Sequence, residues 1–151
     1  MKVWSDDLKV EFPIISQDMM GYKNRYVYLS EFPNKTPSTL HGTQSVFFQG
    51  TVKFDLQEEK IVKKIKFGET KTCGEVFYHK KENAQSEDDG YLMTFLYDWE
   101  TKTSEFVMWD AKTMSDEAVM RAPMNKRVPN GFHTYFVREE DLEWNDEISK
   151  V

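Results

Sequence analysis

The feature that most restricts the fold of this chain is a succession of short runs rich in Val, Ile, Phe and Tyr, with almost no helical periodicity. Short runs of this kind, separated by turn residues, are typical of β-strands. Strands joined one after another by turns build antiparallel sheets, so the sequence predicts an all-β antiparallel meander without an internal domain boundary over residues 1–151. The predicted strands are Arg25–Leu29, Val46–Leu56, Ile61–Phe67, Glu75–His79, Tyr91–Tyr97, Glu105–Trp109, Ala118–Ala122 and Thr134–Val137.

A loose repeat marks the ends of three of these strands, where an aromatic residue is followed by Asp and a polar turn. It occurs at Phe54-Asp55, Tyr97-Asp98 and Trp109-Asp110. An Asp in this place can accept hydrogen bonds from the backbone N–H groups of the turn that follows. The spacing of the repeat does not choose between a sandwich, a barrel and propeller blades.

The segments outside these strands are mostly polar. Glu82–Asp89 is acidic and is predicted to be an exposed loop, and Ser30–Gln44 is predicted to be an irregular connection. The charged tail Arg138–Val151 could form a short helix. Met1–Val10 is interpreted as the end of a strand or loop already in progress.

The charge of the chain bears on its partners. It has 20 Lys and Arg against 26 Asp and Glu, which gives a net charge of −6. Nucleic acid and anionic lipid bind basic surfaces, so neither is an expected partner. The densest basic stretch, Lys60–Lys66, alternates with apolar residues and is interpreted as the solvent-facing side of a strand.

The single cysteine, Cys73, excludes an internal disulfide and a multi-cysteine zinc site, and it favours a reducing compartment. No activating pattern surrounds it, so we expect a small buried residue. No apolar signal segment follows Met1, and the longest mostly apolar run, Tyr91–Tyr97, is too short to cross a bilayer. Secretion by a standard signal and membrane spanning are therefore not expected.

Of the three histidines, His133 has the most restricted surroundings. Pro129 stiffens the approach to it, and Gly131 permits an unusual backbone angle or a close approach just before it. An imidazole fixed in this way could serve as a metal ligand or an acid–base group. The alternative, which spacing alone favours, is a surface or satisfied core histidine. His79 and His41 are expected to face solvent.

Two carboxylates raise a similar question. Glu75 begins an apolar strand and Glu11 precedes Phe12-Pro13, so either side chain could point inward. A buried carboxylate is costly unless it accepts hydrogen bonds or meets a cation. The alternative is that both lie at strand ends and face water.

Five stretches, in order, resemble the C-terminal portion of the carotenoid cleavage oxygenases, the family that also holds the retinoid isomerase of the eye. They are Glu11-Phe12-Pro13-Ile14-Ile15-Ser16, Asn24-Arg25-Tyr26-Val27-Tyr28, Gly74-Glu75-Val76-Phe77-Tyr78, Glu87-Asp88-Asp89-Gly90-Tyr91-Leu92 and Arg127-Val128-Pro129-Asn130-Gly131-Phe132-His133. The sequence departs from the family pattern at Ser16, Val76 and Thr134, which stand where the family has Asn, Pro and Gly.

This resemblance implies that the chain forms about the last two to three blades of a seven-bladed β-propeller, and is therefore incomplete. It further implies an iron(II) ion on the propeller axis, held by four histidines from different blades. Three glutamates accept the ring N–H of three of these histidines, which keeps each ligating imidazole neutral and oriented. By position, His133 is the last iron ligand, and Glu75 and Glu11 are two of the glutamates. Neither His41 nor His79 falls at a ligand position.

The resemblance also implies a function. We expect an iron-dependent dioxygenase that cleaves a conjugated carbon–carbon double bond of a carotenoid or apocarotenoid with O2. The chain alone is expected to be inactive, because one histidine cannot hold iron firmly. Peripheral membrane association would use regions outside this chain, and an intracellular location, cytoplasmic or plastid-like, is expected. The alternative is a non-catalytic β-domain that binds an apolar ligand or a partner chain.

Overall fold

The computed structural model describes residues 8–33, 47–139 and 142. Within these residues the chain forms β-strands and one short 3-10 helix, and no described helix is long and apolar enough to cross a membrane. The elements are β1 Val10–Ile14, η1 Gln17–Met19, β2 Tyr26–Glu31, β3 Gly50–Asp55, β4 Lys60–Lys66, β5 Lys71–Thr72, β6 Phe77–Lys80, β7 Gly90–Asp98, β8 Thr103–Asp110 and β9 Met120–Pro123.

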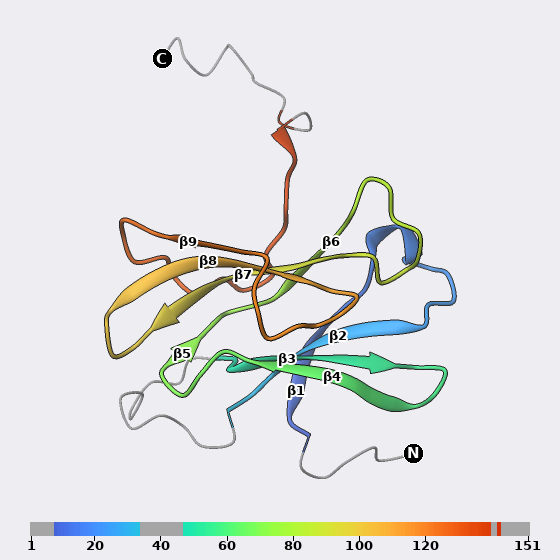
Figure 1. Ribbon diagram of the computed structural model, residues 1–151, viewed down its shortest axis with the longest axis horizontal. Helices are drawn as coiled ribbons and strands as arrows, with labels where there is room; N and C mark the ends of the chain where they lie inside the picture. The colour runs from blue at the N-terminus through green and yellow to red at the C-terminus, as the bar shows by residue number, and fades with distance from the viewer. Residues whose placement is uncertain (1–7, 34–46, 140–141, 143–151) are drawn as a thin grey trace.

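The strands form two antiparallel sheets, each built from strands that are close together in the sequence. The first sheet has the order β1-β2-β3-β4. In the second sheet β5 and β6 both pair with β7, which is followed by β8 and β9. Figure 1 shows the second sheet lying above the first, and an isolated bridge between Phe48 and Cys73 connects them. The predicted all-β antiparallel meander is therefore confirmed.

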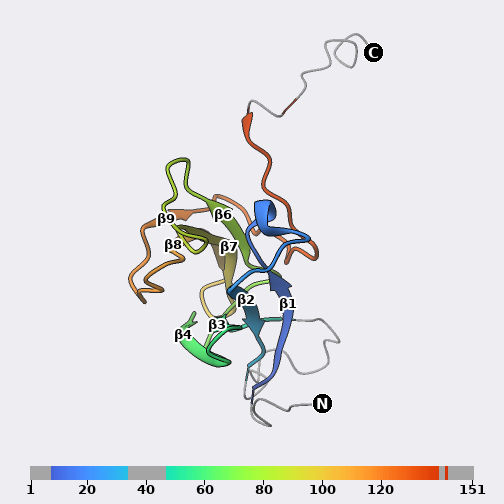
Figure 2. The same cartoon turned by 90° about the vertical axis from the view of Figure 1, so that its right-hand side faces the viewer.

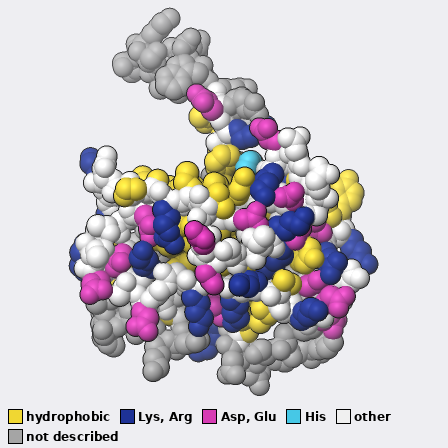
Figure 3. Space-filling model, viewed as in Figure 1, with side chains coloured by type: hydrophobic (Ala, Val, Ile, Leu, Met, Phe, Trp, Pro, Cys, Tyr) yellow, Lys and Arg dark blue, Asp and Glu magenta, His cyan; other side chains and the backbone are white. Residues whose placement is uncertain are grey.

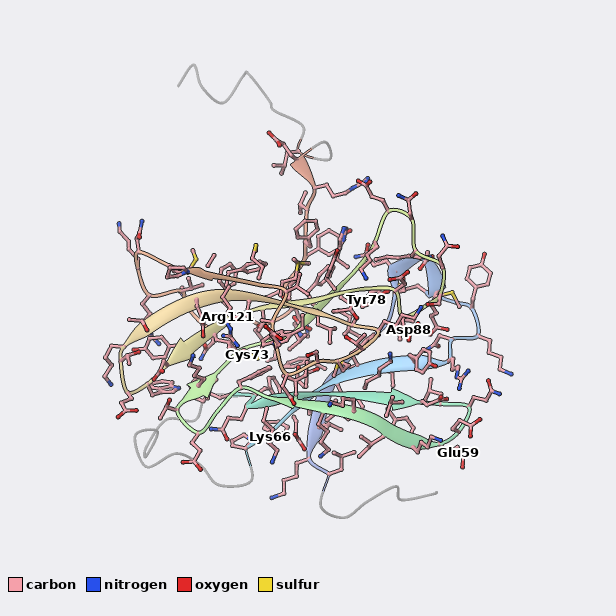
Figure 4. The ribbon with its side chains drawn as sticks, in the orientation of Figure 1. Glu59, Lys66, Cys73, Tyr78, Asp88 and Arg121 are labelled. Atoms are coloured by element: carbon pink, nitrogen blue, oxygen red, sulfur yellow. The ribbon has the colours of Figure 1, made fainter. Side chains whose placement is uncertain are left out.

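The hydrophobic core lies between the two sheets. Two ring pairs cross it: Tyr28 stacks on Tyr78 with centroids 5.3 Å apart, and Phe67 stacks on Trp109 at 5.4 Å. Figure 4 shows Cys73 between the sheets, where it is fully buried as expected. The buried cluster consists of Tyr28, Phe48, Ile65, Phe67, Cys73, Val76, Tyr78, Leu92, Leu96, Val107, Trp109, Ala111 and Met114.

The repeated Asp residues cap the turns that follow their strands, as predicted. Oδ1 of Asp55 accepts the N–H groups of Gln57 and Glu58 at 2.9 and 3.0 Å. Asp98 accepts the N–H of Glu100 at 2.9 Å, and Asp110 accepts that of Thr113 at 2.7 Å. Each hairpin is thus closed by a bond that spans only two or three residues.

Most of the predicted strands are confirmed, with shifted ends. The long strand expected from Val46 begins only at Gly50, and Val46 itself lies outside the described residues. The strand expected over Thr134–Val137 is wrong: this segment belongs to no strand of the described chain. A strand needs a partner for its backbone groups, and the N–H of Thr134 instead donates to a side chain, Glu75.

The predictions for the acidic loop, for two of the histidines and for the C-terminal tail had different outcomes. The loop over Glu82–Asp89 is exposed at its start, but Asp88 is buried, with 7% of its surface exposed, because it pairs with a lysine of the first sheet. His79 is half-buried rather than solvent-facing, because its ring packs on Phe136 with centroids 4.7 Å apart. His41 and nearly all of the tail expected to be helical lie outside the described residues.

The acidic segment Glu87-Asp88 ties the two sheets together. The Glu87 carboxylate accepts the backbone N–H groups of Arg25 and Tyr26 at 2.8 to 3.0 Å, at the start of β2. Asp88 accepts a bond from Lys53 of β3 at 2.7 Å. Figure 4 shows Asp88 close to Tyr78, whose hydroxyl donates to the Glu87 carbonyl at 2.8 Å. This loop segment, which precedes β7 of the second sheet, therefore joins that sheet to the first by hydrogen bonds.

Candidate functional site

Three segments that are far apart in the sequence converge at one end of the molecule. They are strand β1, the turn Cys73–Val76 between β5 and β6, and the segment 128–134 that follows β9. Figure 2 shows the C-terminal segment passing beside β1. The Phe12 ring contacts the rings of Phe132 and His133, with centroids 4.8 and 5.2 Å apart. These are the segments that carry Glu11, Glu75 and His133.

The turn and the C-terminal segment approach each other backbone to backbone. A Cβ atom built on Gly74 would lie 1.9 Å from the carbonyl oxygen of Gly131 and 2.5 Å from its nitrogen. No side chain can occupy that space without moving the backbone, so only glycine fits at position 74. The contact places Glu75, the next residue, beside the segment that carries His133.

The Glu75 side chain is half-buried and does not simply face water. Its Oε2 atom accepts two bonds from Thr134, one from the backbone N–H and one from the hydroxyl at 3.2 Å. The Glu75 carbonyl oxygen accepts the Thr94 hydroxyl at 2.5 Å. Glu75 precedes β6 rather than beginning it. Its carboxylate is held by Thr134 and its carbonyl group by Thr94, and neither residue belongs to β6.

His133 is exposed and packs edge-on against two aromatic rings, Phe12 and Phe132. Its backbone lies in the left-handed region, with φ of 61°. Within the described residues, no hydrogen bond joins its ring to Glu75 or Glu11. The structure thus brings His133 next to Glu75 through the adjoining residue Thr134, and leaves the ring nitrogens available to other groups.

Glu11 is less closely associated with the site. Its side chain is exposed, whereas its neighbours on either side are partly buried, which reflects the alternation of a strand.

Phe12 carries the contact with His133, and it too has a positive φ, of 50°. Residues other than glycine adopt such angles rarely, and strained positions of this kind cluster at functional sites. Phe12 was not among the sequence-based candidates, and Thr134 was noted only as a departure from the family pattern.

The described residues do not make a complete metal site. No group of three or more His, Cys, Asp or Glu side chains among them is placed to hold an ion. Burial raises the pKa of the Cys73 thiol to about 12, so it is not a thiolate ligand at neutral pH. The donors present fit the contribution of one imidazole, from His133, to a site completed by other groups.

An apolar groove of about 270 Å³ adjoins Glu75 and Thr134. Rings from β6, β7, β8 and the C-terminal segment line it, chiefly Phe77, Phe95, Phe106, Tyr135 and Phe136. Figure 3 shows hydrophobic side chains gathered along the edge from which the C-terminal segment leaves the molecule. The groove can accept an apolar group beside the segment that carries His133.

Comparisons with known proteins give consistent results over nearly the whole chain. The family described as "Retinal pigment epithelial membrane protein" matches residues 3–138. The carotenoid 9,10(9',10')-cleavage dioxygenase of Crocus sativus is 36% identical over 149 residues, which cover 89% of this chain and 26% of that protein. The carotenoid 9,10(9',10')-cleavage dioxygenase 1 of Arabidopsis thaliana is 38% identical over 146 residues, covering 89% of this chain and 25% of the relative.

Among solved structures, the cobalt-substituted apocarotenoid oxygenase of Synechocystis superposes with a TM-score of 0.70. It is 24% identical, and the match covers 83% of this chain and 25% of that one. This likeness shows that the two sheets have the fold of part of a β-propeller enzyme. The chain spans about a quarter of the length of these relatives.

Proposed function

This chain belongs to the carotenoid cleavage oxygenase family, and from that membership we propose that it forms the C-terminal part of an iron(II)-dependent dioxygenase. The substrate class is a carotenoid or apocarotenoid, whose conjugated carbon–carbon double bond is cleaved with O2. The observation that carries the proposal is the convergence of the segments of Phe12, Glu75 and His133 at one end of the fold.

In this proposal His133 supplies one of four imidazole ligands, and the other three come from parts of the protein outside the described residues. Glu75 and Glu11 supply carboxylates that accept ring N–H groups of ligating histidines. Such acceptors fix the tautomer and the direction of an imidazole and offset the charge of the metal. When bound, the iron supplies the redox chemistry with dioxygen that converts the double bond into two carbonyl groups.

The apolar groove supports an apolar substrate. Its ring-lined wall adjoins Glu75 and Thr134, the residues next to His133. A long polyene gains binding free energy from such a surface and little from polar contacts. The protein's part is to hold the polyene in a dry site and to orient it.

A second function, a non-catalytic β-domain that binds an apolar ligand or a partner chain, is also supported by the groove. Iron content distinguishes the two. In the full-length protein the dioxygenase proposal expects about one iron per chain, lost in His133→Ala, together with two carbonyl products from a carotenoid. A metal-free protein that is folded and binds carotenoid without cleaving it would support the second function instead.

Two further proposals follow from the family. The 151-residue chain on its own is expected to be inactive, because by the family resemblance only His133 of its histidines falls at a ligand position, and one histidine cannot hold iron firmly. Several relatives are named as chloroplastic, so we propose an intracellular site of action, in the cytoplasm or a plastid. Peripheral membrane association would involve regions outside this chain.

A further inference from the structure

The backbone of His133 needs support from its surroundings. A left-handed conformation in a residue other than glycine costs free energy, and it persists only where neighbouring contacts enforce it. Besides the ring contacts of Phe12 with Phe132 and His133, three contacts made by its backbone hold the segment around it. The N–H of Val128 donates to the Ser104 hydroxyl at 2.9 Å, Gly131 lies against Gly74, and Thr134 donates to Glu75.

Of these three, the Thr134 contact is the nearest to His133 along the chain, and it alone ends on a carboxylate. Both the N–H and the hydroxyl of Thr134 donate to the same carboxylate oxygen, Oε2 of Glu75. Hydrogen bonds to an ionised acceptor are worth more than neutral ones. Among the described residues no other donor reaches the carboxylate, so Oε1 is left to accept a further group.

The Thr134 hydroxyl is specific to this sequence, because the family pattern has Gly at this position. The backbone N–H would be present with any residue except proline at position 134, whereas the second donor requires Thr or Ser. Threonine also limits the rotamers of its own side chain, which reduces the entropy lost when the bond forms. The hydroxyl therefore adds to the hold on Glu75 in a way that a glycine could not.

We propose that Thr134 is a positioning residue: its hydroxyl fastens Glu75 Oε2 to the segment that carries His133, and so fixes the direction of the His133 imidazole. The metal-binding part of this inference rests on the proposed function, in which that imidazole is an iron ligand. Glu75 then acts on His133 through the backbone, in addition to any bond that its other oxygen makes to a ring N–H.

The test uses the full-length protein with Thr134→Val, which removes the hydroxyl and keeps the shape, and with Thr134→Ser, which keeps the hydroxyl. Thr113→Val is the matched control. Thr113 also donates both its N–H and its hydroxyl to one oxygen, Asp110 Oδ1, at 2.7 and 2.9 Å, on an exposed turn. Two quantities are measured: hydrogen exchange of segment 128–137 in metal-free protein, and retention of Fe(II) against a competing chelator.

We expect Thr134→Val to speed exchange of this segment by about tenfold and to weaken Fe(II) retention by about tenfold. Thr134→Ser should restore both, and Thr113→Val should change neither. Unchanged exchange in Thr134→Val would overturn the positioning role, whatever the metal does. If Thr134→Val exchanged faster but the unmodified full-length protein itself retained no Fe(II), the proposed function would be overturned. The role of Thr134 in holding the segment would still be established.

Discussion

Lys53 of β3 donates a hydrogen bond from Nζ to Oδ2 of Asp88 at 2.7 Å, across the boundary between the two sheets. The same ammonium group donates to the carbonyl oxygens of Ala111 and Lys112 at 3.1 and 3.0 Å, so its three protons are all used. Only 2% of the lysine is exposed. A charge taken out of water in this way is tolerated because every donor has an acceptor.

Replacing Lys53 with Met should destabilise the fold by about 3–5 kcal/mol, because it leaves the buried Asp88 carboxylate without its counter-charge. Urea unfolding of the full-length protein would measure the change. Lys60→Met is the matched control, since Lys60 is exposed and lies 3.8 Å from Glu58. It should cost less than about 1 kcal/mol. An equal, small effect of both substitutions would contradict the role assigned to the Lys53–Asp88 pair.

Asp110 makes the stability of the fold depend on pH in the acid range. Burial alone would raise its pKa, but bonds from Lys81 and Thr113 outweigh this and lower the pKa from 3.8 to about 2. Since the folded pKa lies below the unfolded one, the stabilisation is present above pH 3.8 and is lost as the pH falls towards 2. Asp110→Asn should remove on the order of 1–2 kcal/mol of stability at neutral pH and reduce the slope of stability against pH in that window. An unchanged slope would contradict this assignment.

Gly74→Ala should disturb the candidate site more than the sheets. Its Cβ would lie 1.9 Å from the Gly131 oxygen, so the segment 128–134 must move, at a cost of about 1–3 kcal/mol. We expect faster proteolysis within that segment. Gly21→Ala is a useful comparison, because a Cβ there meets nothing within 4 Å and the cost, from φ of 82°, is purely conformational. Proteolysis of the segment that is the same in both variants would argue against the close approach.

Glu75 and His133 should differ in their effects on iron. Under the proposed function, His133→Ala removes a ligand and should abolish stable iron binding in the full-length protein. Glu75→Gln keeps the ligand but loses a charged acceptor, and it should weaken iron binding by ~10–100-fold. Titration with Fe(II) under anaerobic conditions would measure both. If Glu75→Gln left metal affinity and turnover unchanged, the role of Glu75 as an acceptor would be wrong.

The strands and turns could be predicted because their signals are local. Asp55 caps a turn two and three residues away, and the alternation of buried and partly buried residues from Phe106 to Asp110 in β8 comes from the geometry of the strand itself. The prediction failed where the partner was remote. Thr134–Val137 has the composition of a strand, yet no strand pairs with it among the described residues, and its first N–H binds Glu75.

The candidate site was predicted in part. The motifs around Glu75 and His133 singled out two segments that do lie together, whereas the exposed Glu11 is less closely placed than its neighbour Phe12. Nothing in the sequence indicated that Phe12 and His133 share a ring contact and a positive φ. Both features depend on how distant backbones meet.

The order of residues by itself determined the all-β class, the capped hairpins and the motifs of the family, because each is written within a few consecutive positions. Only the tertiary structure decided that Asp88 is buried against Lys53, that Gly74 touches Gly131 and that Thr134 binds Glu75. Those contacts join residues separated by tens of positions. They form only when the two sheets and the C-terminal segment have packed against one another, and a linear pattern carries no record of which surfaces will meet.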